Sequence, residues 1–139
     1  VILQFPFYAG IFGVINGTAL GGWLGGLFVQ VATTDTYPLI VYLYSGVVNI
    51  FVPSGGSKWL IEAPYLLPAA RELAVSPTTT VLAYAYGDST SNLIQPFWAI
   101  PILTVTRMKF GDVLGYTGLI ALVLFAVTVI AMLVIPPML

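Results

Sequence analysis

The sequence predicts an all-α integral membrane protein, and three observations support this fold class. Hydrophobic residues make up 59% of the 139 residues and charged residues only 6%, whereas an ordinary soluble domain carries about 25% charged residues. The mean hydropathy is +1.02. Several long tracts contain no charge, and the tract from residue 113 onwards exceeds the roughly 20 apolar residues that a membrane-spanning helix needs. We therefore expect a transmembrane helix bundle.

The composition also excludes several classes of function. The chain has neither Cys nor His, so it has no thiol chemistry, disulfide or histidine-based zinc site. Four Lys/Arg against five Asp/Glu give a net charge of -1. Without a basic stripe to pair with phosphates, we expect no nucleic-acid partner. We also expect no cofactor beyond a coupling ion.

The first 34 residues are uncharged and fit either one long helix or two short ones. Small residues recur at every fourth position from Ala9 through Gly13, Gly17 and Gly21 to Gly25. This spacing lets helices approach closely inside a membrane. Alternatively, residues 16–18 (Asn-Gly-Thr) simply form a turn between two helices, and the sequence leaves both interpretations open.

The middle of the chain predicts a second apolar helix and a more polar segment. Asp35 and Thr36 can cap a helix start, and Pro38 is tolerated in a first turn, so residues 38–52 should be helical and embedded. Residues 58–73 contain four of the nine charges together with large apolar side chains. We expect this segment to be interfacial or to form one arm of a hairpin, and its two prolines disfavour a straight helix.

The last helix is predicted over residues 113–135, where the paired prolines at 136 and 137 stop it. At 1.5 Å per residue it would reach roughly 35 Å, enough to cross a bilayer. Arg107 and Lys109 form the only close basic pair. The positive-inside tendency therefore places the loop 106–112 in the cytoplasm of a multi-pass protein of the cytoplasmic membrane.

Two polar segments, residues 49–57 and 87–96, interrupt apolar tracts. If residues 80–106 cross the membrane once, Asp88 lies roughly a third of the way across. Irregular backbone at that depth is tolerated only beside protein or a wet cavity, and a carboxylate there is costly and marks a functional site. We favour this embedded break, with the helix unwound over residues 87–92. The alternative is a water-exposed loop between two short segments.

The interrupted segments supply the candidate binding groups. In each interrupted segment an Asn stands four residues before a Pro, which is a weak internal repeat. Paired interrupted segments of this kind point to a transporter binding site. Hydroxyls, amides and freed carbonyls suit Na⁺ near Asp88 and Asn92, or a proton on Asp88. A half-helix beginning near Leu93 would favour an anion. The candidate residues are Asn49, Ser54, Gly55, Gly56, Ser57, Asp88, Ser89, Thr90, Ser91, Asn92 and Gln95.

We expect no catalytic residues and no structural metal. The serines of the two breaks have no His as a base, and a Ser–Lys arrangement with Lys58 is conceivable in a membrane serine hydrolase. Lys58, however, is more simply placed at a helix end near water. A further alternative is that the chain is a non-transporting packing or assembly subunit of the membrane, or an inactive fragment. The small-residue pattern would let such a subunit pack closely against other helices.

Several motifs resemble the short-chain fatty acid transporter family, of the acetoacetate/butyrate permease type within the ion transporter superfamily. The motifs are Gln-Phe-Pro-Phe-Tyr-Ala-Gly at 4–10, Val-Pro-Ser-Gly-Gly at 52–56, Gly-Asp at 87–88, Asn-Leu-Ile-Gln-Pro-Phe-Trp-Ala-Ile-Pro at 92–101 and Gly-Asp-Val-Leu-Gly-Tyr at 111–116. The likeness covers nearly the whole chain. Ser91 stands where the family is expected to have Thr, and Lys58 where members tend to be uncharged.

The resemblance implies secondary active transport of short-chain carboxylates, driven by Na⁺ or H⁺. It also implies one half of an inverted-repeat fold, with a re-entrant hairpin tip at residues 53–57 and a discontinuous helix unwound at 87–92. Because family members are about three times longer, the resemblance makes residues 1–139 a single transmembrane domain from the C-terminal half. Its partners would be the carboxylate substrate, the lipid bilayer, and the N-terminal half or another copy of the chain in a homo-oligomer.

Overall fold

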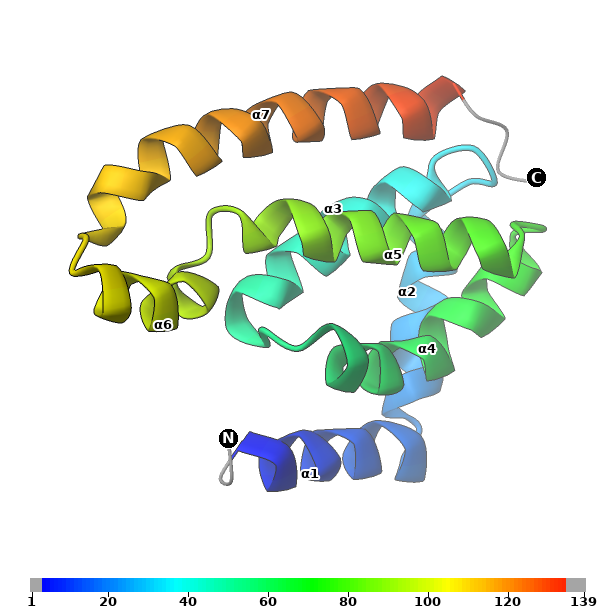
Figure 1. The fold of residues 1–139 in the computed structure, drawn as a ribbon. Helices are drawn as coiled ribbons and strands as arrows, with labels where there is room; N and C mark the ends of the chain where they lie inside the picture. Colours follow the sequence, from blue (N-terminus) through cyan, green and yellow to red (C-terminus); the bar gives the residue numbers. More distant parts are fainter. Residues whose placement is uncertain (1–3, 135–139) are drawn as a thin grey trace.

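The structure, a computed structural model, describes residues 4–134, and all regular elements in that range are α-helices (Figure 1). The predicted all-α fold class is confirmed. The seven helices described are α1 (Gln4–Gly17), α2 (Leu20–Val31), α3 (Tyr37–Phe51), α4 (Gly55–Glu72), α5 (Pro77–Asn92), α6 (Pro96–Thr106) and α7 (Phe110–Val134).

The N-terminal tract forms two helices rather than one. The axes of α1 and α2 differ by 76° across the short break at residues 18–19. Only part of the small-residue pattern makes close contacts. A Cβ on Gly21 would lie 2.9 Å from the Ile15 carbonyl oxygen, and one on Gly25 would lie 3.3 Å from that of Tyr65 in α4, whereas Gly13 and Gly17 have nothing within 4 Å.

Helices α3, α4 and α5 form the centre of the fold. α3 begins at Tyr37, next to the predicted start, although no side-chain hydrogen bond caps it. The chain turns at residues 52–54 and α4 runs back along α3: the Tyr37 hydroxyl donates to the Leu66 carbonyl (2.6 Å), and the Thr34 hydroxyl donates to the Leu73 carbonyl (2.8 Å). α5 then runs parallel to α3.

Helix α4 forms one arm of a helical hairpin with α3, which is one of the two predicted alternatives. It is helical over 18 residues, and Pro64 and Pro68 both lie within it. Of its four charged side chains, Lys58 and Glu62 are buried, whereas Arg71 and Glu72 at its end are exposed. Half of the charge that makes this segment polar therefore lies inside the bundle.

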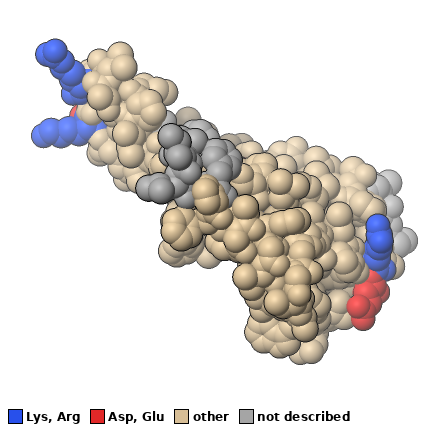
Figure 2. All heavy atoms as spheres, turned by 90° about the horizontal axis from the view of Figure 1, so that it is seen from below, with Lys and Arg blue, Asp and Glu red and all other residues tan. Residues whose placement is uncertain are grey.

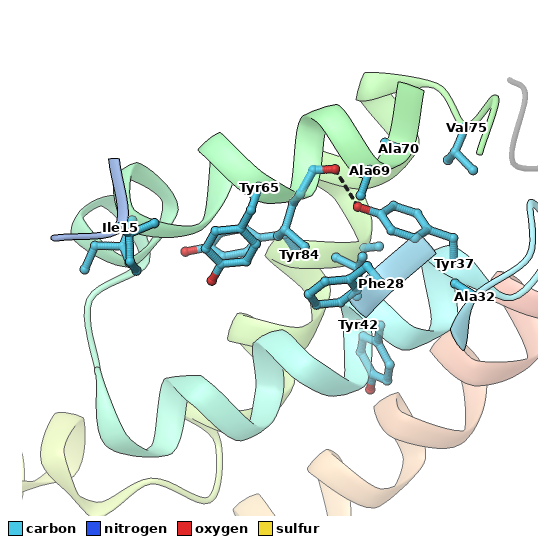
Figure 3. Packing of buried hydrophobic residues seen from close by; sticks show 14 residues of the cluster. Ile15, Phe28, Ala32, Tyr37, Tyr42, Tyr65, Ala69, Ala70, Val75 and Tyr84 are labelled. Carbon is cyan, nitrogen blue, oxygen red and sulfur yellow. Dashed lines mark hydrogen bonds between the residues drawn. The ribbon is translucent and has the colours of Figure 1, made fainter. Parts of the chain in front are cut away.

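An aromatic cluster joins α2, α3 and α4 in the buried core (Figure 3). The Phe28 ring lies 6.2 Å from Tyr37, 5.1 Å from Tyr44 and 6.3 Å from Tyr65, measured between ring centroids. The Tyr hydroxyls are also satisfied, since Tyr44 and Tyr65 share a 2.7 Å hydrogen bond. This packing fixes α4 against α3.

Helix α7 runs back along α3 and α5, on the side of this group opposite α1 (Figure 1). It is the only helix within residues 4–134 that alone is long and apolar enough to cross a membrane, and the bent pair α1–α2 gives a second span if counted as one. The predicted last helix is therefore present to Val134. The prolines expected to stop it lie outside the described residues.

Six of the nine charged residues are exposed and three are not. The exposed ones are Asp35, Arg71, Glu72, Arg107, Lys109 and Asp112. In Figure 2 the visible charges gather at two ends of the molecule, with uncharged surface between them. The three remaining charged residues lie together inside the α3–α4–α5 group.

Candidate functional site

The three charged residues that are not exposed are Lys58 and Glu62 of α4 and Asp88 of α5, with 1%, 1% and 14% of their surface accessible. The prediction that Lys58 sits near water is therefore wrong. Its burial is offset by charge pairing, because its Nζ lies 2.9 Å from Asp88 Oδ1. A buried charge is tolerated only when it is paired and hydrogen-bonded.

Lys58, a residue of α4, contacts both α3 and α5. Its Nζ donates to the carbonyl and the hydroxyl oxygen of Ser45 in α3, both at 2.9 Å. It also lies 4.6 Å from the centroid of the Tyr84 ring of α5. The second carboxylate oxygen of Asp88 accepts a hydrogen bond from Asn92 Nδ2 (3.2 Å). The ion pair is therefore a cross-link between α4 and α5 that α3 completes.

Two asparagines, one near each interruption, meet beside this ion pair. Asn49 Nδ2 of α3 donates to Asn92 Oδ1 at 2.7 Å, to Ser91 Oγ at 2.9 Å and to the Asp88 carbonyl at 3.2 Å. The two asparagines of the repeated Asn-to-Pro spacing, Asn49 and Asn92, are thus in direct contact between α3 and α5. Asn49 is fully buried, so this contact is part of the interior.

Gln95 ties the second interruption to the end of α3. Its Nε2 donates to the carbonyl oxygens of Asn49 (2.7 Å) and Ile50 (3.2 Å). These belong to the last turn of α3, whose carbonyls have no partner within the helix. The two interruptions consequently lie at the same end of the bundle. They share a hollow of about 410 Å³ lined by Ile50, Phe51, Pro53, Ile94, Gln95, Pro96 and Phe97.

The prediction that the chain is unwound at residues 87–92 is wrong, because α5 stays helical to Asn92. Its polar side chains find partners without unwinding: the Ser91 hydroxyl donates back to the Gly87 and Asp88 carbonyls, both at 3.0 Å. The helix stops at residues 93–95 instead. Proline pushes its preceding residue into extended backbone, and Gln95 before Pro96 has φ -88° and ψ 124°.

The candidate binding residues separate into two groups in the structure. Those brought together around Lys58 and Asp88 are Asn49, Gly55, Ser91, Asn92 and Gln95; the Gly55 carbonyl accepts from the Tyr84 hydroxyl, and a Cβ on Gly55 would lie 3.3 Å from Asp88 Oδ2. Thr90 accepts a hydrogen bond from the Tyr42 hydroxyl at 3.3 Å.

The other predicted residues lie apart from this cluster. Gly56 and Ser89 are exposed. Ser57 lines a separate hollow beside Tyr8 and Leu60. Ser54 precedes the first turn of α4 and its side chain makes no cap hydrogen bond. Both the predicted hairpin tip at 53–57 and the observed turn at 52–54 include Pro53 and Ser54, and residues 55–57 belong to α4.

Sequence reasoning missed four members of the cluster: Ser45, Lys58, Glu62 and Tyr84. A spacing signal for them exists. Each of the three helices contributes a pair at i and i+4, namely 45 and 49 in α3, 58 and 62 in α4, and 84 and 88 in α5. Residues four apart lie on one helix face, so three such polar pairs in apolar helices indicate three faces turned toward one another.

A groove of about 340 Å³ adjoins the cluster between α3, α5 and α7. Its walls are mainly aliphatic, with Thr90 and Ser91 on the α5 side. Gly118 and Ala121 of α7 also line it, and they lie 8 and 11 residues after Phe110. At 1.5 Å per residue these positions are about 12 and 16 Å along α7, near the middle of a helix long enough to span a bilayer.

The residues around Asp88, as arranged here, do not fit the predicted Na⁺. Both carboxylate oxygens of Asp88 are engaged, one by the Lys58 ammonium and one by an amide N–H donor of Asn92. A sodium ion would have to displace a positive charge that is already paired. Across residues 4–134, no three acidic side chains gather to form an alternative metal site.

Comparison with known proteins establishes the family. The family model described as short chain fatty acid transporter matches residues 1–136. The chain belongs to the short-chain fatty acid transporter family. The resemblance seen in the motifs is thereby confirmed, and a member of a transporter family is a membrane protein.

Individual relatives agree with this membership. A protein of Escherichia coli strain K12 named "Putative short-chain fatty acid transporter" is 40% identical over 84% of this chain and 26% of its own length. A Haemophilus influenzae protein of the same name is 38% identical over the same shares. The E. coli "Putative basic amino acid antiporter YfcC" is 35% identical over 50% of this chain and 14% of its own.

The matching region therefore spans about a quarter of the length of the short-chain fatty acid transporters, 26% in both. No solved structure matches the chain. The polar residues that meet between α3, α4 and α5, here called the α3–α5 cluster, are Ser45, Asn49, Lys58, Glu62, Tyr84, Asp88, Ser91 and Asn92.

Proposed function

We propose that the protein containing this chain transports short-chain fatty acids across the cytoplasmic membrane, coupled to a cation, and that the α3–α5 cluster is part of its binding site. It acts as a transporter and not as an enzyme. One observation supports the proposal above others: the ion pair of Lys58 and Asp88 lies beside the amide side chains of Asn49 and Asn92, where the two interrupted segments meet.

The cluster has the chemistry that a small carboxylate requires. The Lys58 ammonium and the amide N–H donors of Asn49 and Asn92 lie on neighbouring helices. Such groups form charge-assisted hydrogen bonds with carboxylates. The adjoining groove, lined by residues such as Val47, Ile50 and Ile94, suits a short aliphatic tail. Ligand pockets commonly combine apolar walls with a few polar groups in this way.

The remainder of the site is proposed to come from outside this chain. Because the chain corresponds to about a quarter of its relatives, the translocation path needs either the remaining part of the protein or another copy. The proposed surroundings are the lipid bilayer, with α3 and α4 as a re-entrant hairpin and α5 and α6 as one discontinuous helix. No nucleic-acid partner is proposed.

The test is uptake of labelled butyrate or acetoacetate by proteoliposomes that contain the complete gene product. Protein-free liposomes give the baseline, because the neutral acids also cross lipid unaided. Asp88→Asn and Asn92→Ala should each reduce uptake above baseline by at least about tenfold, a loss of about 1.4 kcal/mol or more. Asp35→Asn, an exposed position, is the matched control and should leave uptake unchanged. Unchanged uptake with both site variants would overturn the site. No uptake above baseline would be the result expected for a non-transporting packing or assembly subunit.

A further inference from the structure

Glu62 is a buried acidic residue of the α3–α5 cluster that has no role in the carboxylate binding proposed above. Its side chain is 1% exposed, and neither carboxyl oxygen has a hydrogen-bond partner. It lies one helical turn after Lys58 on α4. Lys58, however, directs its ammonium to Asp88 and Ser45. Glu62 is thus left as a second carboxyl group beside a cation that is already paired.

The charges around Glu62 do not balance unless one more cation is present. Lys58 is the only cation of the cluster, and Asp88 and Glu62 are both acidic. An ionised carboxylate buried without a partner is strongly disfavoured. One additional positive charge at Glu62 therefore makes the cluster neutral.

A proton suits this position better than a metal ion. The titratable groups that interact with Glu62 are Tyr44 of α3, Lys58 and Tyr65 of α4, and Tyr84 and Asp88 of α5. The other helices against α4 add little, since α2 has no titratable side chain and α1 has only Tyr8. A sodium ion needs several oxygen ligands, whereas a proton needs one carboxyl oxygen, and the Glu62 oxygens have no polar partner.

We propose that Glu62 is the residue that carries the coupling proton of the transporter. This inference rests on the proposed function. A proton from water on one side of the membrane adds to a Glu62 carboxylate oxygen, and the same proton leaves to water on the other side, with no other bond changed. Because a proton and a monocarboxylate have opposite charges, taking up both leaves the net charge of the cluster unchanged.

The first test is infrared difference spectroscopy of the complete protein during a shift in buffer pH, without substrate. The C=O stretch of a protonated carboxyl group should change in the wild type and be lost from the difference spectrum in Glu62→Gln. Glu72→Gln is the matched control because Glu72 is exposed at the end of the same helix. It should keep the band. A band that persists in Glu62→Gln would overturn the assignment.

The second test measures initial rates of butyrate uptake with and without an inward proton gradient, with protein-free liposomes as the baseline. The gradient should stimulate the wild type and Glu72→Gln. Glu62→Gln should lose that stimulation, and Glu62→Asp, which keeps a carboxyl group, should retain it. Equal stimulation of Glu62→Gln and wild type would overturn the proposal while leaving butyrate transport intact.

A wild-type measurement keeps the inference testable even if Glu62→Gln does not fold. A dye inside the liposomes should report proton entry together with butyrate in sodium-free buffer. Uptake that requires Na⁺ and brings no protons would overturn the role of Glu62 but leave the proposed function standing. No uptake of butyrate or acetoacetate above baseline would instead refute the proposed function, and this inference with it.

Discussion

Removing one partner of the Lys58–Asp88 ion pair should destabilise the protein more than removing both. Each partner is tolerated inside the bundle only in the presence of the other. Lys58→Met would leave Asp88 without its cation. Breaking a buried pair on one side costs about 3–5 kcal/mol. We expect a clear decrease in the melting temperature of the detergent-solubilised protein, measured by thermal unfolding.

Replacing both partners should restore much of that loss. In Lys58→Met with Asp88→Leu no charge of the pair remains, and apolar replacements of buried ion pairs are often neutral or stabilising. Arg71→Met serves as the control because Arg71 is exposed on the same helix, and its effect should stay within about 0.5 kcal/mol. Equal melting temperatures for Lys58→Met and Arg71→Met would show that the pair does not stabilise the fold.

Single residues also show where prediction from sequence reached its limit. Asn49, Asp88 and Asn92 were predicted as site residues from composition and spacing, and the structure brings them together. Lys58 was expected near water because a lone charge between apolar tracts most simply lies at a helix end. Its burial depends on a partner 30 positions later in the chain. The four-residue spacings indicate that both residues lie on inward faces, but they do not say which residues of those faces pair.

At the scale of helices, α3 and α5 approach most closely at two glycines. A Cβ on Gly87 would lie 2.2 Å from the Tyr42 carbonyl oxygen and 3.1 Å from the Gly46 amide nitrogen. Both are backbone atoms that cannot rotate away. Gly87→Ala should therefore push the helices apart and lower stability by about 1–3 kcal/mol or more, the usual cost of overpacking, measured as a lower melting temperature.

Gly22→Ala is the matched control for this contact. Gly22 lies inside α2, and a Cβ there would meet nothing within 4 Å. Since alanine favours a helix over glycine by about 1 kcal/mol, this variant should be neutral or slightly stabilising. A Gly87→Ala protein as stable as Gly22→Ala would mean that α3 and α5 do not pack at this distance.

The end of α3 offers a second test at this scale. Gln95→Met keeps the length of the side chain but removes the N–H donor to the Asn49 and Ile50 carbonyls. A buried acceptor left unpaired costs about 1–3 kcal/mol. We expect faster hydrogen exchange in residues 49–54, measured by mass spectrometry. Gln30→Met, at an exposed position of α2, should not change it.

Helix boundaries were predictable where a local signal determines them. The start of α3 near Pro38 and the apolar run of α7 were anticipated within a few residues. The second break was placed at 87–92 because polar composition was read as loss of winding. The structure shows that α3 satisfies those side chains, and that the backbone constraint imposed by Pro96 moves the break to 93–95.

At the scale of the whole molecule, the helix directions predict which chain segments face opposite sides of the membrane. The α4–α5 connection lies at one end of the bundle. From there α5 and then α6 run to the opposite end, where the α6–α7 connection lies, and α7 runs back (Figure 1). If α7 spans the bilayer, Glu72 and Lys109 face opposite compartments. The positive-inside tendency then assigns Lys109, beside Arg107, to the cytoplasm.

Cysteine labelling tests this arrangement, and the chain itself has no Cys to interfere. In an otherwise cysteine-free complete protein, Glu72→Cys should react in intact cells with a membrane-impermeant maleimide, because its side chain is exposed and the orientation predicted here places it on the outer side. Lys109→Cys should react only after the membrane is opened. Labelling of both positions from one side would contradict the spanning arrangement of α5, α6 and α7. Exchanged accessibility of the two positions would keep that arrangement but reverse the orientation, showing that two basic residues are too few to set it.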